Sequence, residues 1–441
     1  MEEGSIRTES VFRLSWPIFL QNITVNLVVL VDFWFYSWLS DETAAVVGQL
    51  YPLTWLGTFV VPVFASTGIA VSSQYLGAKR MERVVPTYMA NLVLTGLLGL
   101  GVAAGFWIFR ADFGRWLGMS EGLNQTADAF NGAMSPLFFC LAIMMAYNAI
   151  LSSRGMTHWA MAVSLMASLL NVVLDGWFVF GLGMEVRGVA MASVISCGLA
   201  TVVSIYLVHH RMGVRFYLRN AWRDLREVTR PLLRIGVPNA AEPLCYCIQQ
   251  IVLSGFIVSL GVQSMAANSY VLRFSMLIIA FSFSLSAGGQ ILMGHWVGAR
   301  RFEDVNRSFY KILRISLATA AIFMGALWLV DDWVLGLFTE DPAIVALGKR
   351  LIAIAFFLET ARVLNIVGGH TLKALGDARF TATVGMVFIW SLLPAVWAID
   401  RWGTLTIEVV WICHAVDELI RGLISLWRWR TGKWQGMGVA G

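Results

Sequence analysis

The sequence predicts an all-α membrane protein with twelve transmembrane helices in two six-helix lobes, and three observations carry that prediction. First, 58% of the 441 residues are hydrophobic and only 13% are charged, whereas an average soluble domain has about 25% charged residues. Second, long apolar runs follow one another with short connections between them. Third, the second half of the chain repeats the first at a constant offset of 221 residues. The composition excludes a cytoplasmic enzyme, a nucleic-acid binder and a disordered interaction tail.

Twelve apolar runs reach the length of about 20 residues that a spanning helix needs. They cover residues 12–39, 45–76, 84–109, 128–153, 157–181, 188–209, 231–260, 266–297, 308–330, 343–373, 379–400 and 404–429. Strands of a membrane barrel would alternate polar and apolar residues, so these continuous runs predict helices. Several runs are longer than a perpendicular span requires, and we therefore expect tilt or kinks.

The basic residues predict the orientation in the membrane. With the N-terminus inside, the inner segments hold 23 of the 32 Lys and Arg residues and the outer segments hold six. Lys and Arg concentrate on the cytoplasmic side of membrane proteins. We therefore expect a multi-pass protein of the plasma or inner membrane with both termini in the cytoplasm.

The internal repeat defines two lobes and the segment that joins them. At the offset of 221 residues, the matching positions include Pro17 with Pro238, GAKRME at 77–82 with GARRFE at 298–303, and Gly155 with Gly376. We expect an N-lobe over residues 1–209, a basic cytoplasmic linker over 210–230 and a C-lobe over 231–441. Because both lobes start on the same side, they form a parallel repeat, the design of many secondary transporters. A phosphate-binding glycine-lysine motif is missing from the sequence, so neither ATP nor another cofactor is expected.

Ionisable residues within the spans are the candidate functional groups, because each costs about 2.5–3.5 kcal/mol at mid-bilayer. They are Asp32, Asp175, Glu242, Arg273, Glu359, Arg362, Asp417, Glu418 and Arg421. Glu359 with Arg362, and Asp417 with Arg421, have the helical spacing of pairs that neutralise each other.

Asp32 and Asp175 are predicted to form a cation site. Both lie at a similar depth in spans that run from inside to outside, and Asn171 shares a helix face with Asp175. Ser193 lies at the same level in the next span. Such oxygens can hold a proton between two carboxylates, or a Na⁺ ion at Asp32, Asn171 and Asp175. The alternative is that each polar group only bonds a neighbouring helix.

Glu242 and Arg273 are weaker candidates for a substrate cavity. Glu242 follows Pro238 by four residues and lines the inner mouth of the cavity, or is an interfacial carboxylate in contact with solvent. Arg273 has no obvious partner nearby in the sequence, so it faces an anionic group in the cavity or pairs with a distant acid.

The chain resembles the multidrug and toxic compound extrusion (MATE) family over roughly residues 10 to 435. The resemblance rests on Leu30-Val31-Asp32, the two GA(K/R)R signatures, Asn171 to Asp175, Gly376-Asp377 and the closing segment 427–434. It implies two six-helix lobes that form a V, and cation-coupled export of organic, often cationic and aromatic, compounds. We expect the protein to act as a monomer.

The resemblance also implies the members of the cation site. Asp32, Asn171 and Asp175 match the family's residues directly, and Ser193 stands where threonine is usual. Asn148 matches the fourth-helix asparagine, although its depth places it nearer the inner end of its span.

Two further positions follow from the resemblance. Pro17 matches a first-helix proline associated with bending. Cys247 stands where the NorM-type branch carries a glutamate, so the C-lobe cation site of that branch is expected to be missing and coupling to run through the N-lobe, as in DinF-like members.

The function expected from the sequence is therefore an antiporter that exports organic compounds in exchange for H⁺ or Na⁺ by alternating access, and not an enzyme. The alternative is a flippase for a lipid-linked precursor, which shares the two-lobe design. Such relatives usually have extra helices and a cationic cavity, and here only Arg273 and Arg362 supply that charge.

Overall fold

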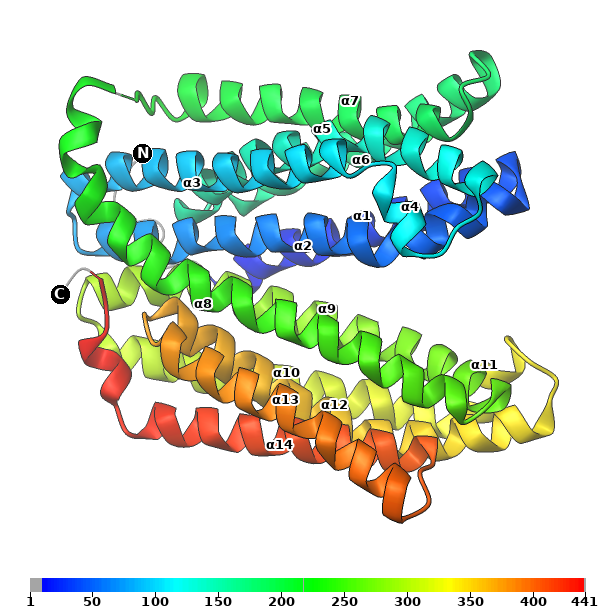
Figure 1. Cartoon of the computed structure of the whole chain (residues 1–441). Coiled ribbons are helices and arrows are strands. Elements are labelled where there is room, and N and C mark those ends of the chain that lie inside the picture. The colour runs from blue at the N-terminus through cyan, green and yellow to red at the C-terminus, as the bar shows by residue number, and fades with distance from the viewer. Residues whose placement is uncertain (1–9, 217, 440–441) are drawn as a thin grey trace. The chain divides into compact units, whose positions relative to one another are not determined.

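The computed structural model describes residues 10–216 and 218–439, and for residues 41 and 218–226 it describes the backbone alone. All regular secondary structure in the described residues is helical (Figure 1). The chain divides into two compact units, Met1–Gly236 and Val237–Gly441. An all-helical chain is what a membrane requires, because a helix satisfies its own backbone polar groups.

In the N-terminal unit, α5 is the central helix and packs against α2, α3 and α7. The helices are α1 (Val11–Leu39), α2 (Asp41–Gly77), α3 (Met81–Ile108), α4 (Asp112–Trp116), α5 (Glu121–Ser153), α6 (Thr157–Gly176) and α7 (Glu185–Tyr206). Helix α1 lies against α6, and α6 against α7. Both α6 and α7 continue directly into a π-helical turn, Trp177–Gly181 and Leu207–Arg211.

In the C-terminal unit, α12 has the corresponding central place and packs against α9, α10 and α14. The helices are α8 (Leu218–Ser259), which begins in the first unit, α9 (Val262–Gly298), α10 (Phe302–Leu329), α11 (Asp331–Gly336), α12 (Pro342–Ala374), α13 (Ala378–Trp402) and α14 (Ile407–Arg430). A short 3-10 helix, Lys433–Gly436, ends the described chain.

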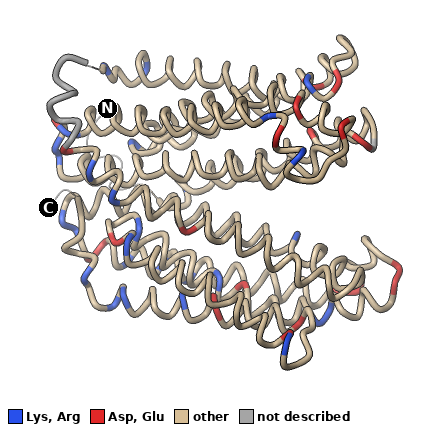
Figure 2. Tube along the Cα trace, viewed as in Figure 1, with Lys and Arg blue, Asp and Glu red and all other residues tan. Residues whose placement is uncertain are grey.

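Each of the twelve predicted spans coincides with a long helix, which confirms the all-α polytopic fold. Eleven of the described helices are long and apolar enough to cross a membrane. The twelfth, α14, carries Asp417, Glu418 and Arg421 in its middle, so its composition alone does not mark it as a span. Figure 2 shows that charged residues lie mostly toward the helix ends of each unit, and that the C-terminal unit also has a group in mid-helix.

The internal repeat extends to single backbone hydrogen bonds. Lys79 and Arg300 adopt the left-handed conformation, with φ of 58° and 56°, although neither is glycine. The N–H of Arg80 donates to the Tyr75 carbonyl at 3.0 Å, and the N–H of Arg301 donates to the Trp296 carbonyl at 2.8 Å. This six-to-one bond is the closing bond of a Schellman motif at a helix C-terminus. The GA(K/R)R segments are therefore two copies of one helix-ending turn.

The short helices α4 and α11 were not predicted from the sequence. Each follows the third long helix of its unit, and each has an aspartate in its first turn, Asp112 and Asp331. They span five and six residues, too few for an apolar period to be recognised.

Candidate cation-binding site

Asp32 and Asp175 face each other across the contact between α1 and α6. Asp175 is 0% exposed, and the two carboxyl groups are within hydrogen-bonding reach of each other. Among the described residues, neither oxygen of Asp175 has a hydrogen-bond donor. Two ionised carboxylates this close repel each other, whereas one proton between them turns the contact into a hydrogen bond.

Asn171 connects this carboxyl pair to α7. With the amide oriented toward Asp32, its Nδ2 donates to Asp32 Oδ1 at 3.0 Å and its oxygen accepts from the backbone N–H and the hydroxyl of Ser193, both at 3.3 Å. This orientation is assigned from the hydrogen-bond network. The Ser193 hydroxyl also lies within hydrogen-bonding reach of Asp32. The structure thus brings together four predicted residues, Asp32, Asn171, Asp175 and Ser193, from three helices.

Tyr36 is a further residue of this site, and the sequence reasoning missed it. It follows Asp32 by one helical turn, is buried, and lies close to both aspartates. Its ring packs edge-on against Phe130 of α5, with ring centroids 5.8 Å apart. The spacing of four residues from Asp32 was the signal that could have identified it.

Apolar side chains line the site on the side of Tyr36. A buried cluster that includes Leu50, Phe130 and Val189 surrounds Tyr36. Apolar walls exclude water and strengthen every electrostatic interaction inside them. A proton or a cation bound at the carboxyl pair therefore has a large effect on the electrostatic energy of the site.

Asn148 lies at a different level of the N-terminal unit. It is buried near the end of α5, where its Oδ1 accepts from the Ser204 hydroxyl of α7 at 3.2 Å. Ser204 follows Ser193 by eleven residues on one helix, which corresponds to about 16 Å along its axis. The structure therefore places Asn148 about three turns from the carboxyl pair, in agreement with its expected depth near the inner end.

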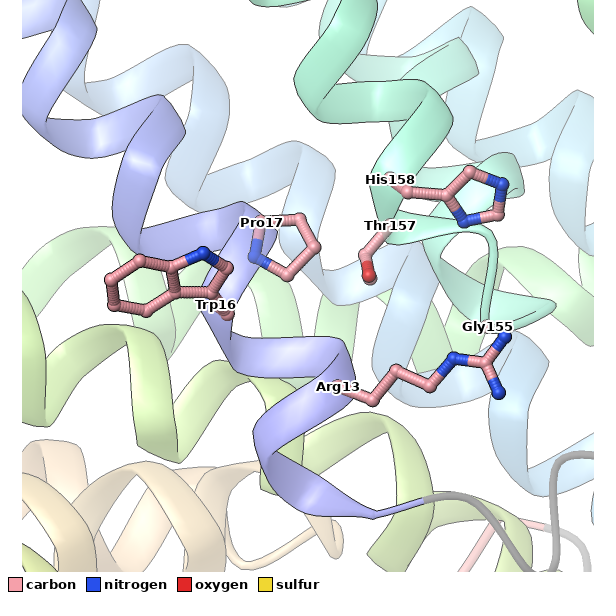
Figure 3. Close-up of a pocket in the computed structure, with 6 residues that line it drawn as sticks. All are labelled: Arg13, Trp16, Pro17, Gly155, Thr157 and His158. Carbon is pink, nitrogen blue, oxygen red and sulfur yellow. The ribbon is translucent and has the colours of Figure 1, made fainter.

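Pro17 lies inside α1, and the helix continues through it. Together with Arg13, Trp16, Gly155, Thr157 and His158 it lines a pocket of about 380 Å³ at the start of α1 and α6 (Figure 3). Proline lacks the N–H that would bond the carbonyl of Arg13, so this turn has one backbone bond fewer than the rest of the helix. A role of Pro17 in bending stays a prediction.

Glu242 of α8 forms an ion pair with Lys373 of α12, with Oε2 and Nζ 2.5 Å apart. The carboxyl group also lies directly against Gly385 of α13. Arg273 of α9 has an exposed side chain. The part of Glu242 and Arg273 in substrate binding stays a prediction.

The remaining charges within the C-terminal spans form ion pairs. The predicted pair Glu359–Arg362 is present at 2.5 Å, and Asp417 pairs with Arg421 as predicted. Glu418 contacts both arginines, a link between α12 and α14 that spacing within one helix could not predict.

Two repeated units of membrane-spanning helices, with a carboxyl pair between α1 and α6, define a membrane transporter. The sequence profile of the MatE family matches residues 17–177 and 238–396, so the chain belongs to the MatE family. The members of this family are transporters and not enzymes.

Individual relatives extend over nearly the whole chain. The chain is 28% identical to the "Uncharacterized transporter YisQ" of Bacillus subtilis (strain 168), with 100% of this chain and 98% of the relative covered. It is 22% identical to the "Probable multidrug resistance protein NorM" of Thermotoga maritima, with 99% and 95% covered.

Solved structures show the same fold. A crystal structure of a MATE transporter in the bent conformation matches with a TM-score of 0.89 at 20% identity, covering 99% of this chain and 98% of that one. A mutant of the Vibrio cholerae MATE transporter VcmN matches with a TM-score of 0.88 at 17% identity, covering 98% and 99%.

Proposed function

We propose that the protein is a cation-coupled antiporter that exports organic compounds in exchange for H⁺ or Na⁺ by alternating access. The observation that carries the proposal is the close approach of the half-buried Asp32 carboxyl group to the buried Asp175 carboxyl group. A relative bears the name "Probable multidrug resistance protein NorM", which supports export of organic compounds. An often cationic and aromatic substrate is the one expected from the sequence.

The coupling step follows from the charge of the carboxyl pair. With one proton shared, the pair carries a single negative charge, which attracts a cationic substrate from the cytoplasm or inner leaflet. A second proton from outside neutralises the pair, weakens substrate binding and favours the return to the inward state. A Na⁺ ion that binds in place of the second proton, held by Asp32, Asn171, Asp175 and the Ser193 hydroxyl, would also neutralise the pair and have the same effect. Coupling requires only that the two ligands favour opposite states.

The proposal includes the arrangement expected from the sequence. The N-lobe (1–209) and C-lobe (231–441) are joined by the linker 210–230, and both termini face the cytoplasm of a plasma or inner membrane. The protein acts as a monomer. Coupling runs through the N-lobe, because Cys247 replaces the acid of the NorM-type C-lobe site.

The test is drug efflux in everted vesicles, with a pH gradient and a Na⁺ gradient imposed separately. Asp32→Asn and Asp175→Asn should each lower coupled transport of an ethidium-like cation by about tenfold or more. Asp112→Asn is the matched control, because this aspartate is a partly exposed residue of α4 that pairs with Arg115. Wild-type rates in both site variants would overturn the proposed coupling role. Binding of a lipid pyrophosphate in place of the cation would instead identify a flippase.

A further inference from the structure

Five buried charged side chains of the C-terminal unit form one continuous chain of ion pairs. Glu359 contacts Arg362 at 2.5 Å, and Arg362 contacts Glu418 at 3.6 Å. Glu418 contacts Arg421 at 3.2 Å, and Arg421 pairs with Asp417. Each of the five is at most 7% exposed. We call these five residues the α12–α14 network.

The charges of the α12–α14 network do not balance. It holds three carboxylates and two guanidinium groups, so the fully ionised network carries one surplus negative charge. An uncompensated charge is expensive to bury, above all inside a membrane. Arginine is already protonated in proteins, so the two guanidinium groups cannot take up a further proton to compensate this charge. The surplus must therefore be compensated by a proton or another cation.

The surplus negative charge lies at the ends of the α12–α14 network and not at its centre. Glu418, in the centre, contacts both arginines and accepts from Asn365 Nδ2 at 2.7 Å. Glu359 and Asp417, at the two ends, each contact one arginine. Among the residues that the structure describes, Glu359 Oε2 and Asp417 Oδ1 are buried without a hydrogen-bond partner.

An independent observation distinguishes the two ends. Ser275 of α9 is 0% exposed, its side chain lies beside Glu359, and its hydroxyl has no partner of ordinary geometry within the described part of the chain. A hydroxyl can accept a proton from a carboxylic acid or donate one to a carboxylate. The Ser275 hydroxyl thus matches either protonation state of Glu359.

The other groups that face the network do not remove the surplus. Tyr246 of α8 is an uncharged phenol near both arginines. His414 of α14 faces both guanidinium groups, which oppose a further positive charge there. Glu242 is near Arg421 but is already paired with Lys373.

We propose that the α12–α14 network binds one proton, held at Glu359 beside Ser275, and that the protein has this second proton site in its C-terminal unit. The arginines contact three of the six carboxylate oxygens and repel a metal cation, so a proton is the ligand that the chemistry favours. The site is separate from the Asp32–Asp175 pair and does not depend on its role in coupling. Its acids lie on α12 and α14.

The experiment is infrared difference spectroscopy of the full-length protein in liposomes, which detects the carbonyl stretch of protonated carboxylic acids. An Asp32→Asn/Asp175→Asn background removes the signal of the other pair. We expect one protonated carboxyl of the network at neutral pH. Glu359→Gln should abolish this signal, and so should Asp417→Asn, because either change leaves two acids for two arginines. Both variants keep a neutral network, so both should fold.

Two more variants complete the design. Arg362→Gln should add a second protonated carboxyl, because the surplus then rises to two. Glu340→Gln, at an exposed position between α11 and α12, should leave the signal unchanged. A signal that persists in both Glu359→Gln and Asp417→Asn would overturn the proposal. So would its absence from the background protein, or its loss on addition of Na⁺ at constant pH.

Discussion

Lys373 Nζ lies 2.5 Å from Glu242 Oε2, so a single ion pair joins the early part of the seventh long helix, α8, to the end of the tenth, α12. Both side chains are largely buried, with 10% and 17% of their surface exposed. Glu242→Gln removes the charge that compensates Lys373. We expect the variant to lose roughly 1–3 kcal/mol of stability, the usual cost of leaving a buried polar group without its partner.

Thermal unfolding of the purified protein measures this loss. The double variant Glu242→Gln/Lys373→Met should recover part of it, because no charge is then left unpaired. Equal destabilisation by the single and double variants would contradict a role for the pair itself.

The glycine beside this pair gives a second prediction. A Cβ at Gly385 of α13 would lie 2.6 Å from the Glu242 carboxyl, so Gly385→Ala must displace the carboxyl group or separate the helices. We expect a loss of about 1–3 kcal/mol, the usual cost of overpacking. Gly325→Ala in α10 is the matched control, since a Cβ there meets open space and alanine favours a helix by about 1 kcal/mol. If both variants unfold at the same temperature, the close approach at Gly385 has no energetic weight.

Tyr36→Phe separates the chemistry of the candidate site from its packing. The change keeps the ring against Phe130 and removes the hydroxyl near Asp32 and Asp175. We expect the unfolding temperature to change little and proton-driven efflux to fall by about threefold to tenfold, the equivalent of roughly one hydrogen bond. Efflux in vesicles measures the rate, and Tyr206→Phe, at an exposed position of α7, should transport at the wild-type rate. Loss of stability without loss of transport would indicate a purely structural residue.

At the left-handed turn of Lys79, we expect a glycine variant to be more stable than an alanine variant, which is the reverse of the usual order within a helix. At φ of 58°, a Cβ is crowded and costs about 1–2 kcal/mol. Lys79→Gly should therefore be more stable than Lys79→Ala by about 1 kcal/mol, as judged by thermal unfolding. At Lys311, an exposed position within α10, the alanine variant should be the more stable one. If the alanine variant were the more stable one at Lys79 as well as at Lys311, the turn would not be strained.

Local patterns in the sequence were sufficient to predict the helices and the pairs within each helix. The spans follow from apolar length, and the Glu359–Arg362 and Asp417–Arg421 pairs follow from helical spacing. The convergence of Asp32, Asn171, Asp175 and Ser193 could be anticipated because depth along a helix is a simple count of residues.

Features that depend on the rotation of one helix against another could not be predicted in this way. Glu418 links two ion pairs only because α14 turns that face toward α12, and no count along either helix contains that information. Tyr36 shares the site because α1 presents the turn after Asp32 to the same neighbours. The left-handed backbone at Lys79 and Arg300 was hidden as well, since glycine is the residue expected there.

The π-helical turn Trp177–Gly181 begins two residues after Asp175. A π turn contains one residue more than an α turn, so it accommodates an insertion without shifting the helix that precedes it. Natural relatives can therefore gain or lose a single residue at this point while their carboxyl pair stays in register. We expect alignments of the family to show one-residue gaps at positions 177–181 and none between Asn171 and Asp175, so that insertions and deletions collect directly beside the candidate cation site.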